Sequence, residues 1–318
     1  MDTTLLFSSE IALSLYPQLI KLIPANVETQ VSIRLIVYSI SAIIYLFLSH
    51  LTSITTIRHL TITIKSLINT TALLKTVWLG IVNIVHIFVS YIAFATLTSG
   101  TSYTLFYMYP IFNVLARNLI WGESTNFTSF VNLVVALVGV YLITSSQINY
   151  LDLITSPDTL ANKLPTSLQY LISKFQLCEN TKIVGVICGI LSALTETIIY
   201  LTVKSDIASI SPFVQLLRTY LLGGIISLAM IIGNKIPEIR ILKSEYIVMI
   251  ILFNLVIGFL GYVLRFYIIP RLSTLKFNSL IFIGVTFSYI WGYIFGKEVI
   301  NFKAILGSLC IIGAIFMN

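Results

Sequence analysis

Continuous apolar runs, separated by short polar stretches, dominate the pattern of this 318-residue chain. Most runs approach the roughly 20 apolar residues that a helix needs to cross the hydrocarbon core of a bilayer. They do not alternate apolar and polar positions, as the strands of a membrane β-barrel do. We therefore predict an all-α integral membrane protein with ten transmembrane helices. The predicted segments are 3–22, 31–49, 76–97, 101–121, 128–145, 183–203, 209–232, 246–269, 277–295 and 302–317.

The composition agrees with a membrane chain. Hydrophobic residues make up 57% and charged residues 10%, whereas soluble domains contain about 25% charged residues. The net charge of +7 is expected to interact with anionic lipid headgroups, because no basic run interleaved with aromatics predicts nucleic-acid binding. The three cysteines lack CxxC spacing, so we predict no metal site, disulfide framework or cofactor. The first apolar run is not preceded by a basic stretch and is not followed by a small-residue cleavage site. We therefore predict no signal peptide there.

The longest polar stretch, residues 146–182, separates two groups of five segments. Apolar residues within it recur at helical spacing, which predicts an amphipathic helix lying on the membrane surface; a partly ordered linker is the alternative. We therefore divide the chain into a first repeat at 1–145, a connecting loop at 146–182 and a second repeat at 183–318.

The two groups of segments resemble each other. A Gly122-Glu123 step precedes the last segment of the first half, and Gly296-Lys297-Glu298 precedes the last segment of the second. Both glutamates are predicted to cap the helix that follows. A lysine and then an arginine also recur at matching places, as Lys21 with Arg34 and Lys204 with Arg218. Five helices per half is an odd number, so the halves insert in opposite directions. Such inverted repeats build transporters that work by alternating access.

These features resemble the drug/metabolite transporter superfamily in its EamA-like branch. The resemblance also includes the predicted Tyr109-Pro110 kink in the run 107–112, although no proline at 280–290 matches Pro110. It implies a non-enzymatic transporter that exports or exchanges small metabolites, with both termini in the cytosol. The distribution of lysine and arginine over the loops does not decide the orientation.

Two glutamates lie inside predicted membrane segments, where a charge near the bilayer centre costs at least ~2.5–3.5 kcal/mol. Glu10 and Lys21 share one helical face. Glu196, Tyr200 and Lys204 share another, at steps of four residues. Each acid is a candidate to bind a cationic group of the substrate or to carry a proton. The alternative is that each neutralises an arginine and fixes helix packing.

Three arginines are candidates for holding an anionic substrate: Arg34, Arg218 and Arg265. The planar guanidinium suits carboxylate and phosphate groups. The alternative is that these long side chains extend to the headgroup region, which is favoured for Arg34 by its place near the predicted start of a helix.

One histidine and two tyrosines complete the candidate site. His86 shares a helical face with Asn83 and Ser90, where it can contact substrate or carry a proton, or simply pack. Tyr107 and Tyr289 lie in aromatic-rich segments, which is typical both of cavity walls and of packing.

The sequence therefore predicts a secondary transporter of a small polar metabolite that is anionic or zwitterionic. A nucleotide-sugar or sugar-phosphate exchanger is the alternative within this class, and a membrane scaffold or receptor is the alternative outside it. The absence of a GxxxxGK[ST] run argues against an ATP-driven pump, so a proton or a counter-substrate is the expected driving partner. The oligomeric state is not predicted.

Overall fold

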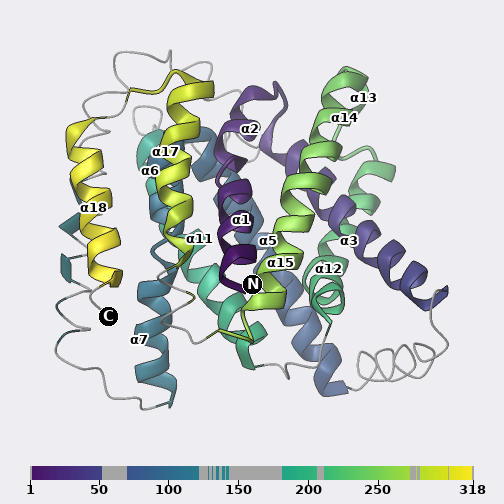
Figure 1. The fold of residues 1–318 in the computed structure, drawn as a ribbon. Coiled ribbons are helices and arrows are strands. Elements are labelled where there is room, and N and C mark those ends of the chain that lie inside the picture. The colour runs from purple at the N-terminus through teal and green to yellow at the C-terminus, as the bar shows by residue number, and fades with distance from the viewer. Residues whose placement is uncertain are drawn as a thin grey trace.

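The computed structural model describes residues 2–51, 70–121, parts of 128–142, 181–205, 211–272, 277, 280–299 and 301–316. Every regular element among these residues is helical, in agreement with the predicted fold class (Figure 1). The first half contains α1 (Asp2–Leu13), α2 (Tyr16–Leu22), α3 (Val27–Leu51), α5 (Thr70–Thr96), α6 (Ser99–Phe106) and α7 (Tyr109–Trp121). The second half contains α11 (Thr181–Ser205), α12 (Pro212–Ile232), α13 (Glu238–Ile241), α14 (Ser244–Phe253), the π-helix η3 (Asn254–Phe259), α15 (Leu260–Ile268), α17 (Ile283–Gly296) and α18 (Phe302–Phe316).

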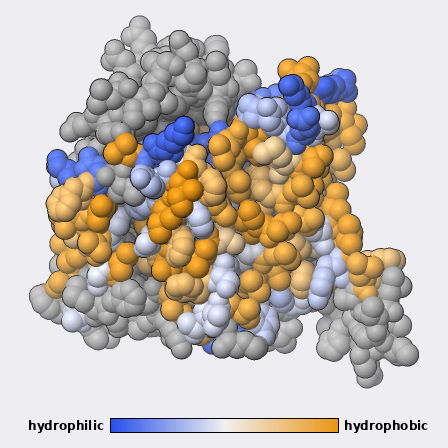
Figure 2. All heavy atoms as spheres, turned by 45° about the horizontal axis from the view of Figure 1, so that its top comes forward, coloured by the Kyte–Doolittle hydropathy of each residue, from blue (hydrophilic) through white to orange (hydrophobic). Residues whose placement is uncertain are grey.

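Five helical stretches are long and apolar enough to cross a membrane: Val27–Leu48, Leu73–Thr96, Ile183–Ser205, Pro212–Ile232 and Ser244–Ile268. The helices Ile283–Gly296 and Phe302–Ala314 are apolar but shorter. Large apolar side chains are exposed along these helices, among them Leu74 and Ile232. Figure 2 shows this apolar surface, with hydrophilic residues gathered toward one edge. The chain is therefore a multi-pass integral membrane protein. The number of ten helices and the inverted repeat stay predictions.

Two of the predicted segments are broken helices. The segment 3–22 is not one helix, because α1 ends at Leu13 and α2 begins at Tyr16, with Pro17 in the first turn of α2. Proline lacks the backbone donor of an interior helical turn and is tolerated at a helix start. The segment 101–121 breaks between α6 and α7, just before Pro110. The kink predicted there is confirmed as a break in the helix.

Helices of the first half pack mainly against helices of the second half. α5 lies along α11, and α3 lies along α12. α1 packs against α15, and α6 packs against α17 (Figure 1). Polar and charged side chains from several of these helices meet in the middle of the molecule.

A polar network centred on Glu298 joins distant parts of the chain. The Glu298 carboxylate accepts hydrogen bonds from Lys21 Nζ at 2.7 Å, from Gln18 Nε2 at 2.9 Å and from the backbone N–H of Ser99 at 2.9 Å. Ser99 is the first residue of α6. Glu298 therefore caps α6 from 199 residues away. The prediction that it caps the next helix, α18, was wrong, because both oxygens of the carboxylate accept hydrogen bonds from the backbone N–H of Ser99 instead.

Replacing Glu298 with glutamine should lower the free energy of unfolding by about 1.5–3 kcal/mol, the range for hydrogen bonds to charged groups. Glutamine keeps the size of the side chain but loses the negative charge that Lys21 and the α6 N-terminus require. Thermal unfolding of the purified protein in detergent measures the effect. Glu245→Gln is the matched control, because Glu245 is exposed on α14. Equal melting temperatures for the two variants would contradict a stabilising role for the network.

Candidate functional site

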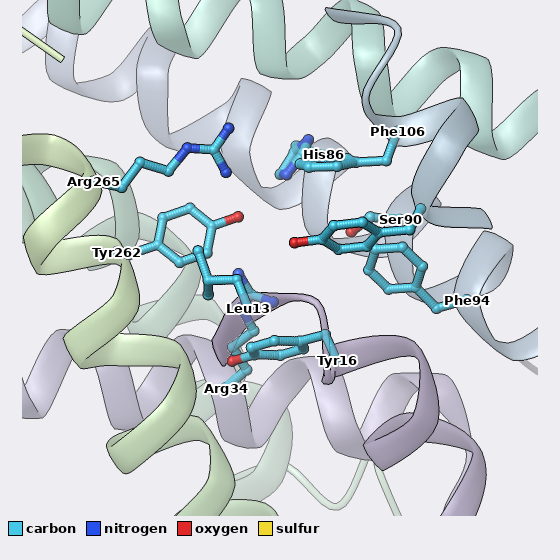
Figure 3. A pocket seen from close by; sticks show the side chains of 10 residues that line it. Leu13, Tyr16, Arg34, His86, Ser90, Phe94, Phe106, Tyr262 and Arg265 are labelled. Atoms are coloured by element: carbon cyan, nitrogen blue, oxygen red, sulfur yellow. The ribbon is translucent and has the colours of Figure 1, made fainter. Parts of the chain in front are cut away.

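A small cavity lies among α1, α2, α3, α5, α6 and α15 in the middle of the molecule (Figure 3). Its volume is about 20 Å³, which is enough for roughly one water molecule. Two arginines, a histidine and several aromatic rings face it. The lining residues are Leu13, Tyr16, Arg34, His86, Ser90, Phe94, Tyr103, Phe106, Tyr262 and Arg265.

Arg265 lies at the centre of a buried ionic cluster. Its Nη2 lies 3.0 Å from Glu196 Oε1, and its Nε lies 3.8 Å from Glu10 Oε1. Its Nη2 also donates a hydrogen bond to Tyr109 Oη at 2.5 Å. The Tyr107 hydroxyl donates to the Glu10 carboxylate. Arg265, Glu10 and Glu196 each have side chains at most 3% exposed. One guanidinium therefore faces two carboxylates, contributed by α1 and α11.

His86 lies against the acid of α11 in this group of charges. Its Nε2 lies 3.4 Å from Glu196 Oε2. Its Nδ1 lies 3.2 Å from the Ser192 carbonyl oxygen and 3.1 Å from Thr195 Oγ1. The histidine is thus held by α11 on one side and lines the cavity from α5. We call Glu10, His86, Glu196 and Arg265 the ionic cluster.

Arg34 occupies a different environment on the other side of Tyr262. Its guanidinium carbon lies 4.8, 5.0, 5.5 and 5.2 Å from the ring centroids of Tyr16, Tyr38, Tyr91 and Tyr262. These distances are in the range of cation–π attraction, which contributes about 0.5–2 kcal/mol per contact. We call the rings that surround Arg34, together with Tyr220, the tyrosine cage.

The hydrogen bonding of Arg34 is incomplete. Its Nη2 donates to Tyr220 Oη at 3.1 Å, but its Nε is buried without a hydrogen-bond partner. The residue is only 3% exposed, so the alternative in which Arg34 reaches the headgroup region does not describe this structure. α3 begins at Val27 rather than at the predicted residue 31, which places Arg34 nearly two turns into the helix.

A turn of π-helix fixes two rings of the tyrosine cage. Asn254, the first residue of η3, accepts hydrogen bonds through Oδ1 from Tyr16 Oη at 2.9 Å and from Tyr91 Oη at 3.5 Å. Its Nδ2 donates to the Ile250 carbonyl at 2.8 Å, which orients the amide. Isolated π turns often occur at functional sites, and here the turn brings the asparagine and Gly258 against the cage.

The structure brings together five of the residues proposed from the sequence and separates others. Glu10, His86, Tyr107, Glu196 and Arg265 meet in or against the ionic cluster, and Arg34 lines the same cavity.

Three candidates lie apart from the cavity lining. Tyr200 packs on the Tyr109 ring at 6.3 Å. Arg218 donates through Nε to Thr76 Oγ1 at 3.3 Å. The ring of Tyr289 lies so close to Gly100 that a Cβ there would come within 2.0 Å of it. These three residues therefore line helix contacts rather than the cavity itself.

The sequence reasoning missed the tyrosine cage and Asn254. Tyr38 lies four residues after Arg34 on α3, and Tyr262 lies three residues before Arg265 on α15. Both spacings place the ring and the guanidinium on the same helical face. Aromatic residues at these spacings from a membrane arginine were the available signal. Tyr16, Tyr91 and Tyr220 come from other helices, and no local pattern connects them to Arg34.

Buried charges among apolar helices define the class of this molecule: a multi-pass membrane protein with ionisable groups at its centre. Residues 183–318 match the EamA-like transporter family. This match covers only the second half of the chain; over that half it is consistent with the drug/metabolite transporter superfamily and with the resemblance inferred from the sequence. Members of the family are transporters rather than enzymes.

A solved structure shares the fold over almost the whole chain. Fifteen chains match. One of them, described only as "Crystal structure of protein", has a TM-score of 0.58 and 11% sequence identity, and the match covers 99% of this chain and 96% of that chain. At this identity the likeness shows the fold alone. No curated protein matches the chain. Within the described part of the chain, no group of three His, Cys, Asp or Glu residues can hold a metal ion.

Proposed function

We propose that this protein is a secondary active transporter of a small anionic or zwitterionic metabolite, and that the substrate binds in the cavity between Arg34 and the ionic cluster. The observation that carries the proposal is the placement of two buried arginines on one central cavity, with two buried carboxylates beside one of these arginines. Ionisable groups inside a membrane are costly, and they typically mark substrate or ion pathways.

The packing of the helices supports an inverted repeat. If the chain is divided at the loop 146–182, α5 is the third helix of the first half and packs on α11, the first helix of the second. The reciprocal pair is α15, from the third helix of the second half, on α1, from the first helix of the first half. A pseudo-twofold axis requires such an exchange of partners. Binding sites of inverted-repeat transporters lie at the interface between the repeats.

The size of the cavity supports alternating access. A space of about 20 Å³ holds roughly one water, so a metabolite can enter only if the surrounding helices separate. The breaks between α1 and α2 and between α6 and α7 lie next to the cavity lining. Such interruptions of membrane helices are common at transporter sites and provide points at which the half-helices can rotate.

A nucleotide-sugar or sugar-phosphate exchanger is the second candidate. It is favoured by the two guanidinium groups that face the cavity, since arginine forks bind phosphate oxygens well. A cytosolic location of both termini, and coupling to protons or to a counter-substrate, belong to the same proposal.

Uptake into proteoliposomes tests the proposal, with a panel of radiolabelled amino acids, organic acids, sugar phosphates and nucleotide sugars. At least one of these classes should accumulate above protein-free vesicles. Glu196→Gln should reduce that uptake by roughly 10-fold or more, because it removes the charge that holds Arg265 and faces His86. Glu245→Gln, at an exposed position, should transport normally. Absence of uptake for every class, or normal uptake by Glu196→Gln, would contradict the proposal.

A further inference from the structure

Arg34 and Arg265 face the same cavity, but only Arg265 has carboxylate partners. Glu196 and Glu10 lie at 3.0 and 3.8 Å from its nitrogen atoms. Among the residues that the structure describes, Arg34 forms no ion pair, although it is 3% exposed. Its recorded partners are the Tyr220 hydroxyl and the faces of four tyrosine rings.

A buried guanidinium without a counter-charge is an incomplete arrangement. Ring faces attract the cation, but they do not accept all of its N–H groups, and Nε is left without a hydrogen-bond partner. Arg265 Nε also lacks such a partner, but Arg265 has two carboxylates beside it. A buried charge is ordinarily paired with an opposite charge or hydrogen-bonded throughout. The unpaired donor belongs to a residue that lines the cavity, so an anion that enters the cavity can complete it.

The ionic cluster has the opposite balance of charge. It contains two carboxylates and one guanidinium, and Tyr107 and Tyr109 direct hydroxyl groups into it. Arg265 is therefore already neutralised by acids of the chain itself. The Tyr262 ring lies 5.2 Å from the Arg34 guanidinium and 5.7 Å from that of Arg265. The cavity thus has Arg34 and the tyrosine cage at one end and Arg265 with His86 at the other, where Glu10 and Glu196 lie behind the lining, beside Arg265.

Building on the proposed function, we propose that Arg34 and the tyrosine cage form the anion subsite of the transporter, and that this subsite accepts a substrate with a single anionic group of carboxylate size. Arg265 holds Glu10 and Glu196 and does not bind the substrate anion. A second anionic group on the substrate would lie beside Arg265 at the other end of the cavity, where the charge of Arg265 is already balanced by Glu10 and Glu196 behind it. These two carboxylates repel a further anion. A neutral or cationic group is accepted there. The subsite therefore selects against nucleotide sugars and other multiply charged phosphates.

Binding to the purified full-length protein in a neutral detergent tests the subsite with matched pairs of probes. Lactate is compared with malate, and glutamine with glutamate; the second member of each pair has one more carboxylate. At least one singly anionic probe should raise the melting temperature. Its partner should need a concentration at least about 10-fold higher for half of the same shift. The same protein titrated with phosphatidylglycerol in mixed micelles shows whether a lipid headgroup, rather than a soluble carboxylate, is the anion bound.

Variants at Arg34 separate a binding role from a structural one. Arg34→Gln should abolish the probe-induced shift and raise the melting temperature of the ligand-free protein, because it removes an uncompensated charge. Arg34→Lys keeps the charge without the planar fork and should weaken binding while remaining folded. Glu245→Gln, at an exposed site on α14, should bind like the wild type.

Three results would overturn the inference: no shift with any singly anionic probe or with phosphatidylglycerol, equal binding of the doubly charged partners, or an unchanged shift in Arg34→Gln. Uptake measurements distinguish this failure from failure of the proposed function. If multiply charged substrates are taken up and Arg34→Gln does not change this uptake, the protein is a transporter but the proposed subsite is wrong. If binding depends on Arg34 but no substrate is transported, the subsite stands and the proposed transport function is wrong.

Discussion

Arg265→Gln is expected to lower the free energy of unfolding by about 3–5 kcal/mol, the cost of removing one partner from a buried ion pair. The substitution leaves Glu10 and Glu196 without a cation at sites that are at most 3% exposed. Glutamine donates fewer hydrogen bonds than arginine and has no charge. Thermal unfolding in detergent should show a large fall in melting temperature, and uptake should be lost with it.

A second substitution shows that the loss comes from the unpaired acids. Adding Glu196→Gln to Arg265→Gln removes one of the two buried carboxylates that have lost their cation. The double variant should therefore be more stable than Arg265→Gln alone. Arg240→Gln, at an exposed position on α13, is the matched control and should unfold like the wild type. If Arg265→Gln also unfolds like the wild type, the ionic cluster is not the centre of the folded molecule.

The membrane character of the fold could be predicted because it depends on composition over long stretches. Runs such as the one that forms α12 are predominantly apolar, and the bilayer imposes helices on such runs by requiring internal hydrogen bonds. The break before α7 was also predicted, because Pro110 acts locally. The equivalent signal for the break between α1 and α2 was Pro17. It lies near the end of the predicted segment and was not used.

The composition of the candidate site could be predicted only in part. The cost of a membrane charge identified Glu10, Glu196 and Arg265 without any knowledge of their contacts. The depth of a residue within the membrane was harder to infer, because the depth of Arg34 depends on where α3 begins. The direction in which a side chain points was harder still. Arg218 contacts Thr76 on α5 and is not part of the cavity lining. Its direction depends on the rotation of α12 about its own axis, which is set by packing against other helices.

Long-range contacts account for what the sequence could not indicate. Glu298 caps a helix 199 residues away, and Asn254 binds a tyrosine 238 residues away. Neither pairing has a local pattern. The π turn at Asn254–Phe259 likewise has no signal of its own within the apolar run. The position of this turn is explained only by the tyrosine rings that pack against it.

Those rings make Gly258 a sensitive position. A Cβ at Gly258 would lie 1.8 Å from Tyr16 Oη and 2.0 Å from Tyr38 Oη. The two hydroxyls are hydrogen-bonded to each other at 2.7 Å, and Tyr16 also donates to Asn254, so neither can move without breaking the cage. Gly258→Ala should therefore destabilise the protein by about 1–3 kcal/mol through overpacking. The gain in helix propensity, about 0.8–1.0 kcal/mol, is too small to offset this cost.

The effect of Gly258→Ala on transport should be larger than its effect on stability. Displaced rings no longer surround Arg34, and errors of about 1 Å in a binding site can cost on the order of 100-fold in rate. Uptake by proteoliposomes and melting temperature are measured on the same preparations. Gly313→Ala is the matched control, because within the described part of the chain its added Cβ meets no atom within 4 Å beyond its chain neighbours and the backbone of its own helix, and it should be neutral or slightly stabilising. If both alanine variants transport and unfold alike, the contact between the π turn and the tyrosine cage does not position Arg34.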